Sequence, residues 1–94
     1  MSENIDDLTI EYMEDGIATV KELDKVILSR GAWATILFRY QDWDRAKQVY
    51  GADKYSIRPY QKRNGVFQQR SKFNISSAEQ GKKIIEALSG WMAE

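Results

Sequence analysis

The sequence predicts an α+β domain in which a four-stranded antiparallel β-meander is followed by one C-terminal α-helix. Three observations predict this fold. Four strand-like segments come first, short glycine-containing links join two pairs of them, and the apolar period changes from two to about 3.6 residues only near the C-terminus. Short links favour antiparallel neighbours, because a parallel pair needs a long crossover connection.

Residues 1–16 are expected to form an acidic arm, and residues 17–94 are expected to form the folded domain. Met1 to Asp7 is polar and acidic, which is typical of a disordered terminus. Leu8 to Met13 is a candidate for a short additional strand.

Ile17 to Ser29 fits two descriptions. The spacing of its aliphatic residues suits one face of a helix, whereas the β-branched pair Val26-Ile27 and the flanking glycines suit a strand, which we favour. Ala32 to Trp43 is rich in β-branched and aromatic residues and has the strongest strand character in the chain. Asp44 to Asp53 is expected to be a loop. Along the second strand, one face is expected to hold Ala34, Ile36, Phe38 and Tyr40, and the other Trp33, Arg39 and Trp43.

Lys54 to Lys62 and Val66 to Ile75 are the two arms of an expected hairpin around Asn64-Gly65. Asn-Gly supplies the two residues with positive φ of a type I′ turn, whose twist suits the strands it joins. Side chains alternate along a strand, so one face of the hairpin is expected to be largely apolar and the other cationic. The cationic side of the first arm comprises Lys54, Ser56, Arg58, Tyr60 and Lys62.

Ser77 followed by Gln80 has capping-box spacing and predicts the start of the helix. An apolar stripe then recurs at helical spacing and comprises Ile84, Ile85, Leu88, Trp91 and Met92. We expect it to cover an apolar sheet face made of Ile36, Phe38, Ile57, Phe67 and Phe73. An ordinary core would explain part of the stripe. Its breadth predicts a second surface as well, a symmetry-related copy that contacts Ile84, Leu88 and Trp91.

Charge is distributed unevenly, although the chain has 14 basic and 14 acidic residues. Residues 1–24 hold eight acids and one base, whereas residues 25–75 hold eleven bases and three acids. Such asymmetry indicates a nucleic-acid surface with an acidic arm. The simplest interpretation of the arm is a solubilising tail, and the alternative is that it lies over the basic surface when nucleic acid is absent.

The chain contains no cysteine and no histidine, which excludes disulfides, cysteine zinc sites and a Ser-His-Asp arrangement. We expect a protein that is not an enzyme and has no cofactor or metal, and we interpret Asp42, Asp44 and Asp53 as solvated carboxylates rather than magnesium ligands. The sequence has no signal-peptide pattern and no apolar run near the ~20 residues that span a bilayer. These features predict a cytoplasmic protein without membrane contact.

One face of the sheet is expected to stay open and to bind nucleic acid, since an antiparallel sheet can be covered on a single face. Basic side chains follow phosphates, and aromatic rings stack on unpaired bases. The candidate nucleic-acid-binding residues are Trp33, Arg39, Trp43, Lys54, Arg58, Tyr60, Lys62, Arg70 and Lys72. The competing interpretation is an ordinary solvated sheet face.

The second half of the chain contains a series of residues whose order and spacing form a pattern: Ile57-Arg58, Tyr60, Gly65, Lys72, and Ser77 to Gln80 at the helix start. This pattern resembles the DNA-binding domain of the transcriptional coactivator family called positive cofactor four, which has bacterial and phage relatives. Two positions depart from the family pattern. Ala78 stands where the family has proline, and Gln61 stands where eukaryotic members have tryptophan.

The resemblance implies a homodimer formed largely through the C-terminal helix, with Arg58 and Lys72 in a DNA channel. We therefore expect a non-enzymatic, dimeric single-stranded DNA-binding protein with little sequence preference that serves transcription, replication or recombination. It would be nucleoid-associated if its source is bacterial or a phage. A single-stranded RNA-binding regulator and a protein-interaction module remain alternatives, because stacking and phosphate contacts hardly distinguish RNA from DNA.

Overall fold

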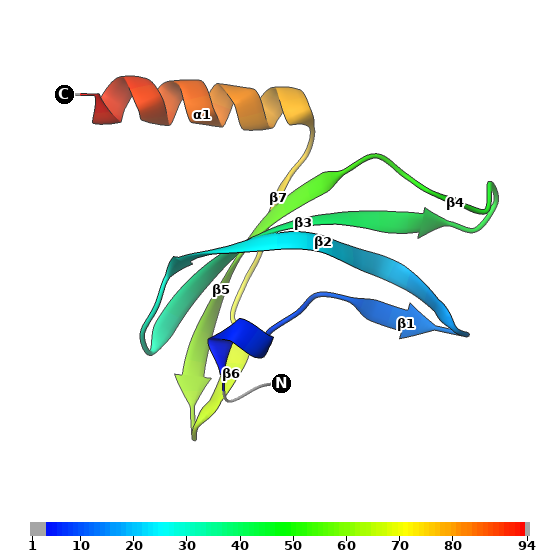
Figure 1. Cartoon of the computed structure of the whole chain (residues 1–94). Coiled ribbons are helices and arrows are strands. Elements are labelled where there is room, and N and C mark those ends of the chain that lie inside the picture. The colour runs from blue at the N-terminus through cyan, green and yellow to red at the C-terminus, as the bar shows by residue number, and fades with distance from the viewer. Residues whose placement is uncertain (1–3, 94) are drawn as a thin grey trace.

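The computed structural model describes residues 4–93 and shows a strongly curved antiparallel β-sheet followed by one C-terminal helix (Figure 1). The predicted α+β class is therefore confirmed. After a short 3-10 helix, η1 (Ile5–Asp7), the elements are β1 (Tyr12–Glu14), β2 (Ile17–Ser29), β3 (Trp33–Asp44), β4 (Val49–Tyr50), β5 (Lys54–Arg63), β6 (Val66–Gln69), β7 (Phe73–Ile75) and α1 (Ala78–Met92).

The strands follow one another in the sheet in the order β1-β2-β3-β5-β6, while β4 pairs with β3 and β7 pairs with β5. β2 covers the residues that the sequence assigned to a strand, and β3 differs from its predicted range by one residue at each end. Strand rather than helix is therefore the correct description of Ile17–Ser29. Two hairpins turn through left-handed residue pairs, Asp15-Gly16 (φ 52° and 79°) and Asn64-Gly65 (φ 52° and 79°), as a type I′ turn requires.

The prediction of four strands is wrong, because the part of the chain that the structure describes contains seven. The expected second hairpin arm is divided into β6, which pairs with residues 60–63, and β7, which pairs with residues 55–57. Pro59 lies at the break: its carbonyl oxygen accepts from the Arg70 N–H at 3.0 Å, but a proline nitrogen has no hydrogen to donate in return. The ladder is interrupted there.

The core lies on the side of the sheet that we call the inner face, which carries alternate β3 residues from Ala34 to Tyr40. The register of β3 with β5 places Tyr60 opposite Ala34, and Arg58 opposite Ile36. The buried cluster consists of Ile5, Leu8, Ala34, Ile36, Phe38, Tyr60 and Phe67. The expected apolar sheet face is therefore wrong, since Ile57 and Phe73 lie on the opposite, outer face.

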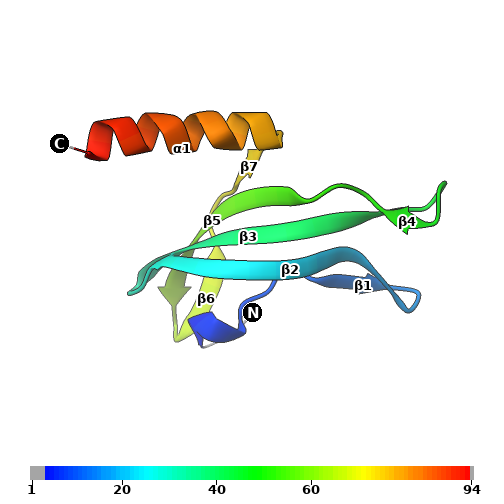
Figure 2. The same cartoon turned by 45° about the horizontal axis from the view of Figure 1, so that its top comes forward.

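α1 begins where the sequence predicted, with the Ser77 Oγ accepting from the Gln80 N–H at 3.1 Å and the Gln80 Oε1 accepting from the Ser76 N–H at 2.6 Å. The helix then runs away from β7 on the outer side of the sheet, whereas η1 lies on the inner side (Figures 1 and 2). No residue of α1 is buried. The prediction that its stripe covers the sheet of its own chain is wrong, because the link at Ser76-Ser77 directs the helix outward.

The N-terminal segment contributes to the core instead of being a disordered tail. Ile5 and Leu8 are only 7% and 6% exposed and pack on the inner face. The prediction of disorder is therefore wrong for residues 4–7, and residues 1–3 lie outside the described residues. The expected extra strand at Leu8 to Met13 exists in shifted form as β1.

Candidate nucleic-acid interface

The most cationic part of the structure is the β5–β6–β7 unit, residues 54–75, which we call the cationic ribbon. Residues 54–78 contain no acid, so nothing within the ribbon neutralises its bases. These bases are Lys54, Arg58, Lys62, Arg63, Arg70 and Lys72. A continuous acid-free run along one edge of a sheet favours contact with a polyanion.

Arg58 is held in a fixed position on the inner face by neighbours from β5 and β6. Its Nε donates to the Ser56 Oγ at 3.1 Å and its Nη1 donates to the Gln69 Oε1 at 3.3 Å. Ser56 is fully buried and donates in turn to the Asn74 Oδ1 at 2.8 Å. An oriented, half-exposed guanidinium with donors to spare is suited to phosphate oxygens.

The remaining cations of the ribbon are exposed. Lys62 places its ammonium 5.4 Å from the centre of the Phe67 ring, near the hairpin tip. Arg63, Arg70 and Lys72 form no ion pair with any residue of the 4–93 range. Lys54 differs from them, because its Nζ lies 2.7 Å from the Asp42 carboxylate, and that hydrogen bond raises the pKa of Lys54 above its ordinary value. The ribbon thus carries four cations besides Arg58 that form no ion pair with any residue of the 4–93 range, namely Lys62, Arg63, Arg70 and Lys72.

Tyr60 lies in the core and not on an open surface as the sequence predicted. Its ring is 5% exposed on the inner face. Burial raises the pKa of its hydroxyl above the ordinary tyrosine value, against a smaller lowering by Arg58. The side chains of β5 alternate as predicted, but the register with β3 places the side that carries Arg58 and Tyr60 on the core face.

The raised pKa of Tyr60 gives an expected result. In an alkaline absorbance titration, one tyrosine should ionise late, and this phase should be missing from Tyr60→Phe. Because the folded-state pKa is raised, the associated stabilisation is present at neutral pH and is lost as pH rises through the folded-state value. Circular dichroism should verify the fold over the same pH range. An unchanged late phase in Tyr60→Phe would contradict the assignment.

The other expected stacking rings lie on the outer face, with Arg39. Trp33 is 54% exposed beside the β2–β3 turn and pairs with Gln61 of the ribbon. Trp43 packs edge-on against Tyr50, with ring centres 5.0 Å apart. Ten residues of strand separate the two tryptophans, or roughly 33 Å.

The Arg39 guanidinium lies 3.8 Å from the Asp53 carboxylate on this outer face, while Arg58, Tyr60 and Lys62 lie on the inner face. The predicted single open face is therefore wrong. The register between strands decides on which face of the sheet each side chain lies, and a shift of one residue moves all side chains of a strand to the opposite face. The structure brings Arg58 and Lys62 together on the inner face and separates them from Arg39 and Trp43 on the outer face, while Arg70 pairs through its backbone with Pro59, on the outer-face side of β5.

The three aspartates discussed as an alternative metal site each have other partners. Asp42 pairs with Lys54, and Asp53 accepts from the Gln41 amide at 2.8 Å. Asp44 accepts from the N–H groups of Ala46 and Lys47 in the following turn. Within residues 4–93 no group of three or more carboxylates is arranged to hold a metal ion.

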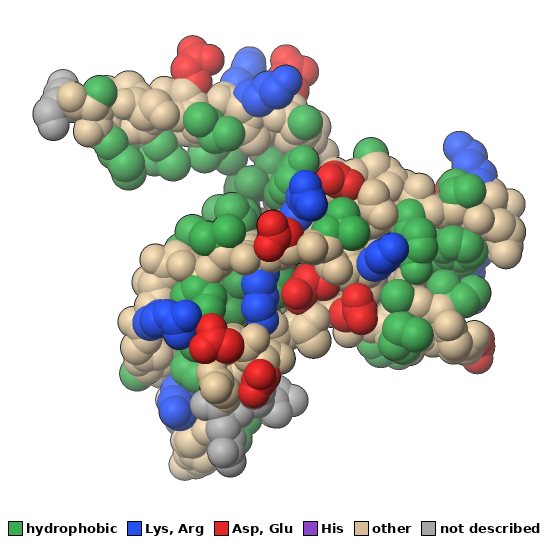
Figure 3. Space-filling view, in the orientation of Figure 1, with side chains coloured by type: hydrophobic (Ala, Val, Ile, Leu, Met, Phe, Trp, Pro, Cys, Tyr) green, Lys and Arg blue, Asp and Glu red, His purple; other side chains and the backbone are tan. Residues whose placement is uncertain are grey.

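Exposed apolar side chains gather on α1 and on the outer face of the sheet. In Figure 3 they follow the side of the helix that is turned toward the sheet, and charged side chains lie on the opposite side. Leu88 is 40% exposed and Trp91 is 73% exposed, while Ile84 is half-buried. We call the following set the apolar surface: Val26, Phe73, Ile85, Leu88, Trp91 and Met92.

Some residues of the interface were not identified from the sequence. Gln69 and Asn74 orient Arg58, and Arg63 adds a cation at the hairpin tip. The sequence alone does not identify these residues, because a polar residue on a strand does not reveal which residue of the neighbouring strand it contacts until the register is known. Pro59 is the exception, since a proline inside a strand-like segment already indicates a break in pairing.

Comparison of the chain with protein-family models, with curated proteins and with solved structures found no match. Within residues 4–93 there is also no helix that is long and apolar enough to cross a membrane.

Proposed function

We propose that this protein binds single-stranded DNA without enzymatic activity and with little sequence preference. The observation that carries the proposal is the acid-free cationic ribbon, which holds an oriented Arg58 and the exposed bases Lys62, Arg63, Arg70 and Lys72. Basic groups along one edge provide phosphate contacts that do not depend on sequence. Such a protein would act where strands separate, in transcription, replication or recombination.

Trp33 is the exposed ring nearest to the ribbon by strand pairing, and it would provide stacking on the outer face, opposite the side that carries Arg58 and Lys62. An aromatic face can stack on any unpaired base, which favours single strands over duplexes. The resemblance of residues 57–80 to the positive cofactor four family supports the same ligand. It also matches Arg58 and Lys72 to basic positions of that family's DNA channel.

The proposal includes a homodimer in which two copies join through their apolar surfaces. The helix has an apolar stripe but no buried residue, so the isolated protomer leaves that stripe in water. The radius of gyration is 15.1 Å, whereas a compact domain of this length has one of about 12 Å. A second copy is the occupant we favour, because one patch that contacts its own equivalent forms a closed pair.

A binding titration tests the function. Oligothymidylate, the matched single-stranded RNA and a duplex of equal length are compared by fluorescence anisotropy at two salt concentrations. We expect the single strand of DNA to bind at least about tenfold more tightly than the duplex at moderate salt, because a duplex hides the base faces. Equal affinities would contradict the stacking contribution, and tighter RNA binding would favour the RNA alternative.

A further inference from the structure

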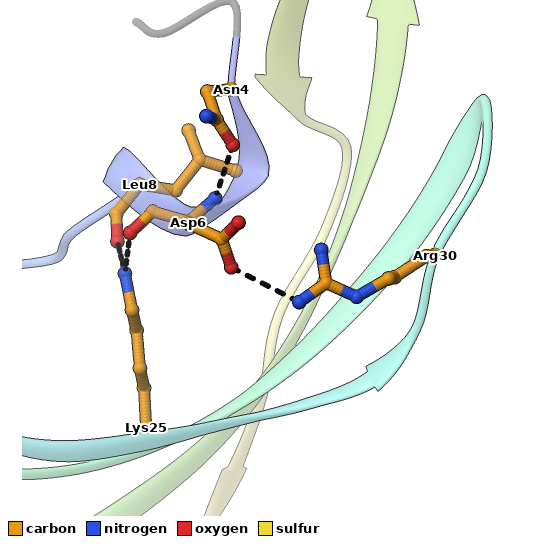
Figure 4. A network of polar contacts seen from close by, with 5 residues as sticks. All are labelled: Asn4, Asp6, Leu8, Lys25 and Arg30. Carbon is orange, nitrogen blue, oxygen red and sulfur yellow. Dashed lines mark hydrogen bonds and ion pairs between the residues drawn. The ribbon is translucent and has the colours of Figure 1, made fainter.

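Residues 4–10, which we call the strap, cross the inner face of the sheet and are attached to it by side chains. The Lys25 ammonium from β2 donates to the carbonyl oxygens of Asp6 and Leu8, both at 2.6 Å. The Arg30 guanidinium lies 3.1 Å from the Asp6 carboxylate. Figure 4 shows this network, with the strap above β2 and Arg30 reaching back to it.

The strap covers the aromatic part of the inner face. Ile5 and Leu8 pack in one cluster with Tyr60 and Phe67. An open depression remains at the strap's edge, between Leu8 and the ribbon residues Phe67 and Gln69. The aromatic rings are therefore hidden beneath the strap, and an entrance to them is already present.

The strap presents the same two kinds of groups to the sheet as an unpaired nucleic-acid strand would, namely apolar groups and oxygen atoms. Its apolar side chains pack in one buried cluster with aromatic rings, on which bases would stack, and its carbonyl and carboxylate oxygens face Lys25 and Arg30, where phosphate oxygens would lie. We propose that the strap and single-stranded DNA exclude each other on the inner face, so that binding to that face requires the strap to leave. This inference rests on the proposed function and specifies how access to its site is regulated.

The mode of attachment permits such a movement. Within residues 4–93 the strap makes no backbone-to-backbone hydrogen bond with the sheet, so it can detach without breaking the strand ladder. Its polar contacts to the sheet are exposed or half-buried side-chain bonds, including those from Thr9 and Ile10 to the Glu22 carboxylate. Opening the strap exposes the buried side chains of Ile5 and Leu8, which has a free-energy cost because apolar surface returns to water, and such local opening still costs less than global unfolding.

Hydrogen exchange on the full chain tests the inference. The amides of Asp7 and Leu8 are hydrogen-bonded within the strap and report its closure. Saturating oligothymidylate of about 20 nucleotides should accelerate their exchange by at least about fivefold, and a duplex at the same concentration should not. Leu8→Ala should tighten oligothymidylate binding, because it removes an apolar anchor of the strap and so raises the fraction of chains in which the strap is open.

A pair of charge variants distinguishes exclusion by the attached strap from electrostatic screening of the DNA by the acidic arm. Asp6→Asn and Asp7→Asn remove the same charge from adjacent residues, but only Asp6 pairs with Arg30. Exclusion predicts a larger gain in affinity for Asp6→Asn, whereas screening by the acidic arm predicts equal gains that shrink as salt rises.

Each outcome has a distinct meaning. If oligothymidylate binds but the strap amides remain equally protected, the inference is overturned and the proposed function stands. Absence of binding by the wild-type protein would overturn the proposed function together with the inference. If Leu8→Ala fails to fold, the exchange measurement on the wild-type chain decides the question alone.

Discussion

Replacing Leu88 with Glu is expected to dissociate the proposed homodimer. Leu88 is 40% exposed in the protomer and belongs to the apolar stripe of α1. Fully burying a leucine side chain is worth about 1.5–3 kcal/mol, so covering the 40% of Leu88 that is exposed is worth about 0.6–1.2 kcal/mol per copy, and in a two-fold symmetric interface the change is made twice. The loss of ~1.2–2.4 kcal/mol corresponds to a dissociation constant about 8- to 60-fold higher, and the cost of burying two unpaired carboxylates adds to it. Sedimentation at micromolar concentration should therefore show a monomer or an unfolded chain.

Lys82→Glu is the matched control for this experiment. It also places a carboxylate on α1, but at an exposed position outside the stripe, so the oligomeric state should not change. A wild-type protein that sediments as a folded monomer would contradict the dimer proposal. A dimer that survives Leu88→Glu would place the contact on another surface.

Replacing both Arg70 and Lys72 with Ala is expected to weaken single-stranded DNA binding strongly and to flatten its salt dependence. Each phosphate contact contributes about 0.7 to the slope of log affinity against log salt on single strands, so two contacts remove about 1.4. At 0.1 M salt this corresponds to a loss on the order of 10-fold to 30-fold. Anisotropy titrations at several salt concentrations measure both quantities.

The double replacement of Lys82 and Lys83 with Ala removes the same net charge from the helix and serves as the control. If the ribbon binds the phosphates, this second variant should keep the wild-type slope. Equal losses in the two variants would mean that net charge attracts DNA, without a defined path along the ribbon. That result would contradict the interface proposed for residues 54–75.

Local features of the sequence predicted the elements well, because their signals come from neighbouring residues. The β-branched residues of Ile17–Ser29, the Asn64-Gly65 turn and the Ser77 cap each determine their own local structure. Pro59 also carried a signal for the divided arm. Its missing donor explains why one predicted strand is present as β6 and β7.

The candidate site was predicted less well, because the face of the sheet on which a side chain lies depends on the register between strands. The pairing of Ile36 with Arg58 makes the cationic side of β5 the core side, and no feature within β5 specifies this pairing. The strap was missed for a similar reason. Ile5 and Leu8 are two apolar residues in an acidic segment, and only the inner face of the sheet provides a place to bury them.

The meander connectivity described above has a consequence for how the protein assembles. Four of the six pairings between the described strands join consecutive strands, and the other two, β3 with β5 and β5 with β7, skip one short strand, so the protomer's sheet forms without long crossover connections. In the proposed homodimer, the meeting of two protomers would be a separate step whose rate depends on protein concentration. Apparent stability would consequently rise with the amount of protein present, since association shifts the folding equilibrium by mass action. Expression level in the cell would then set how much folded protein is available to bind DNA.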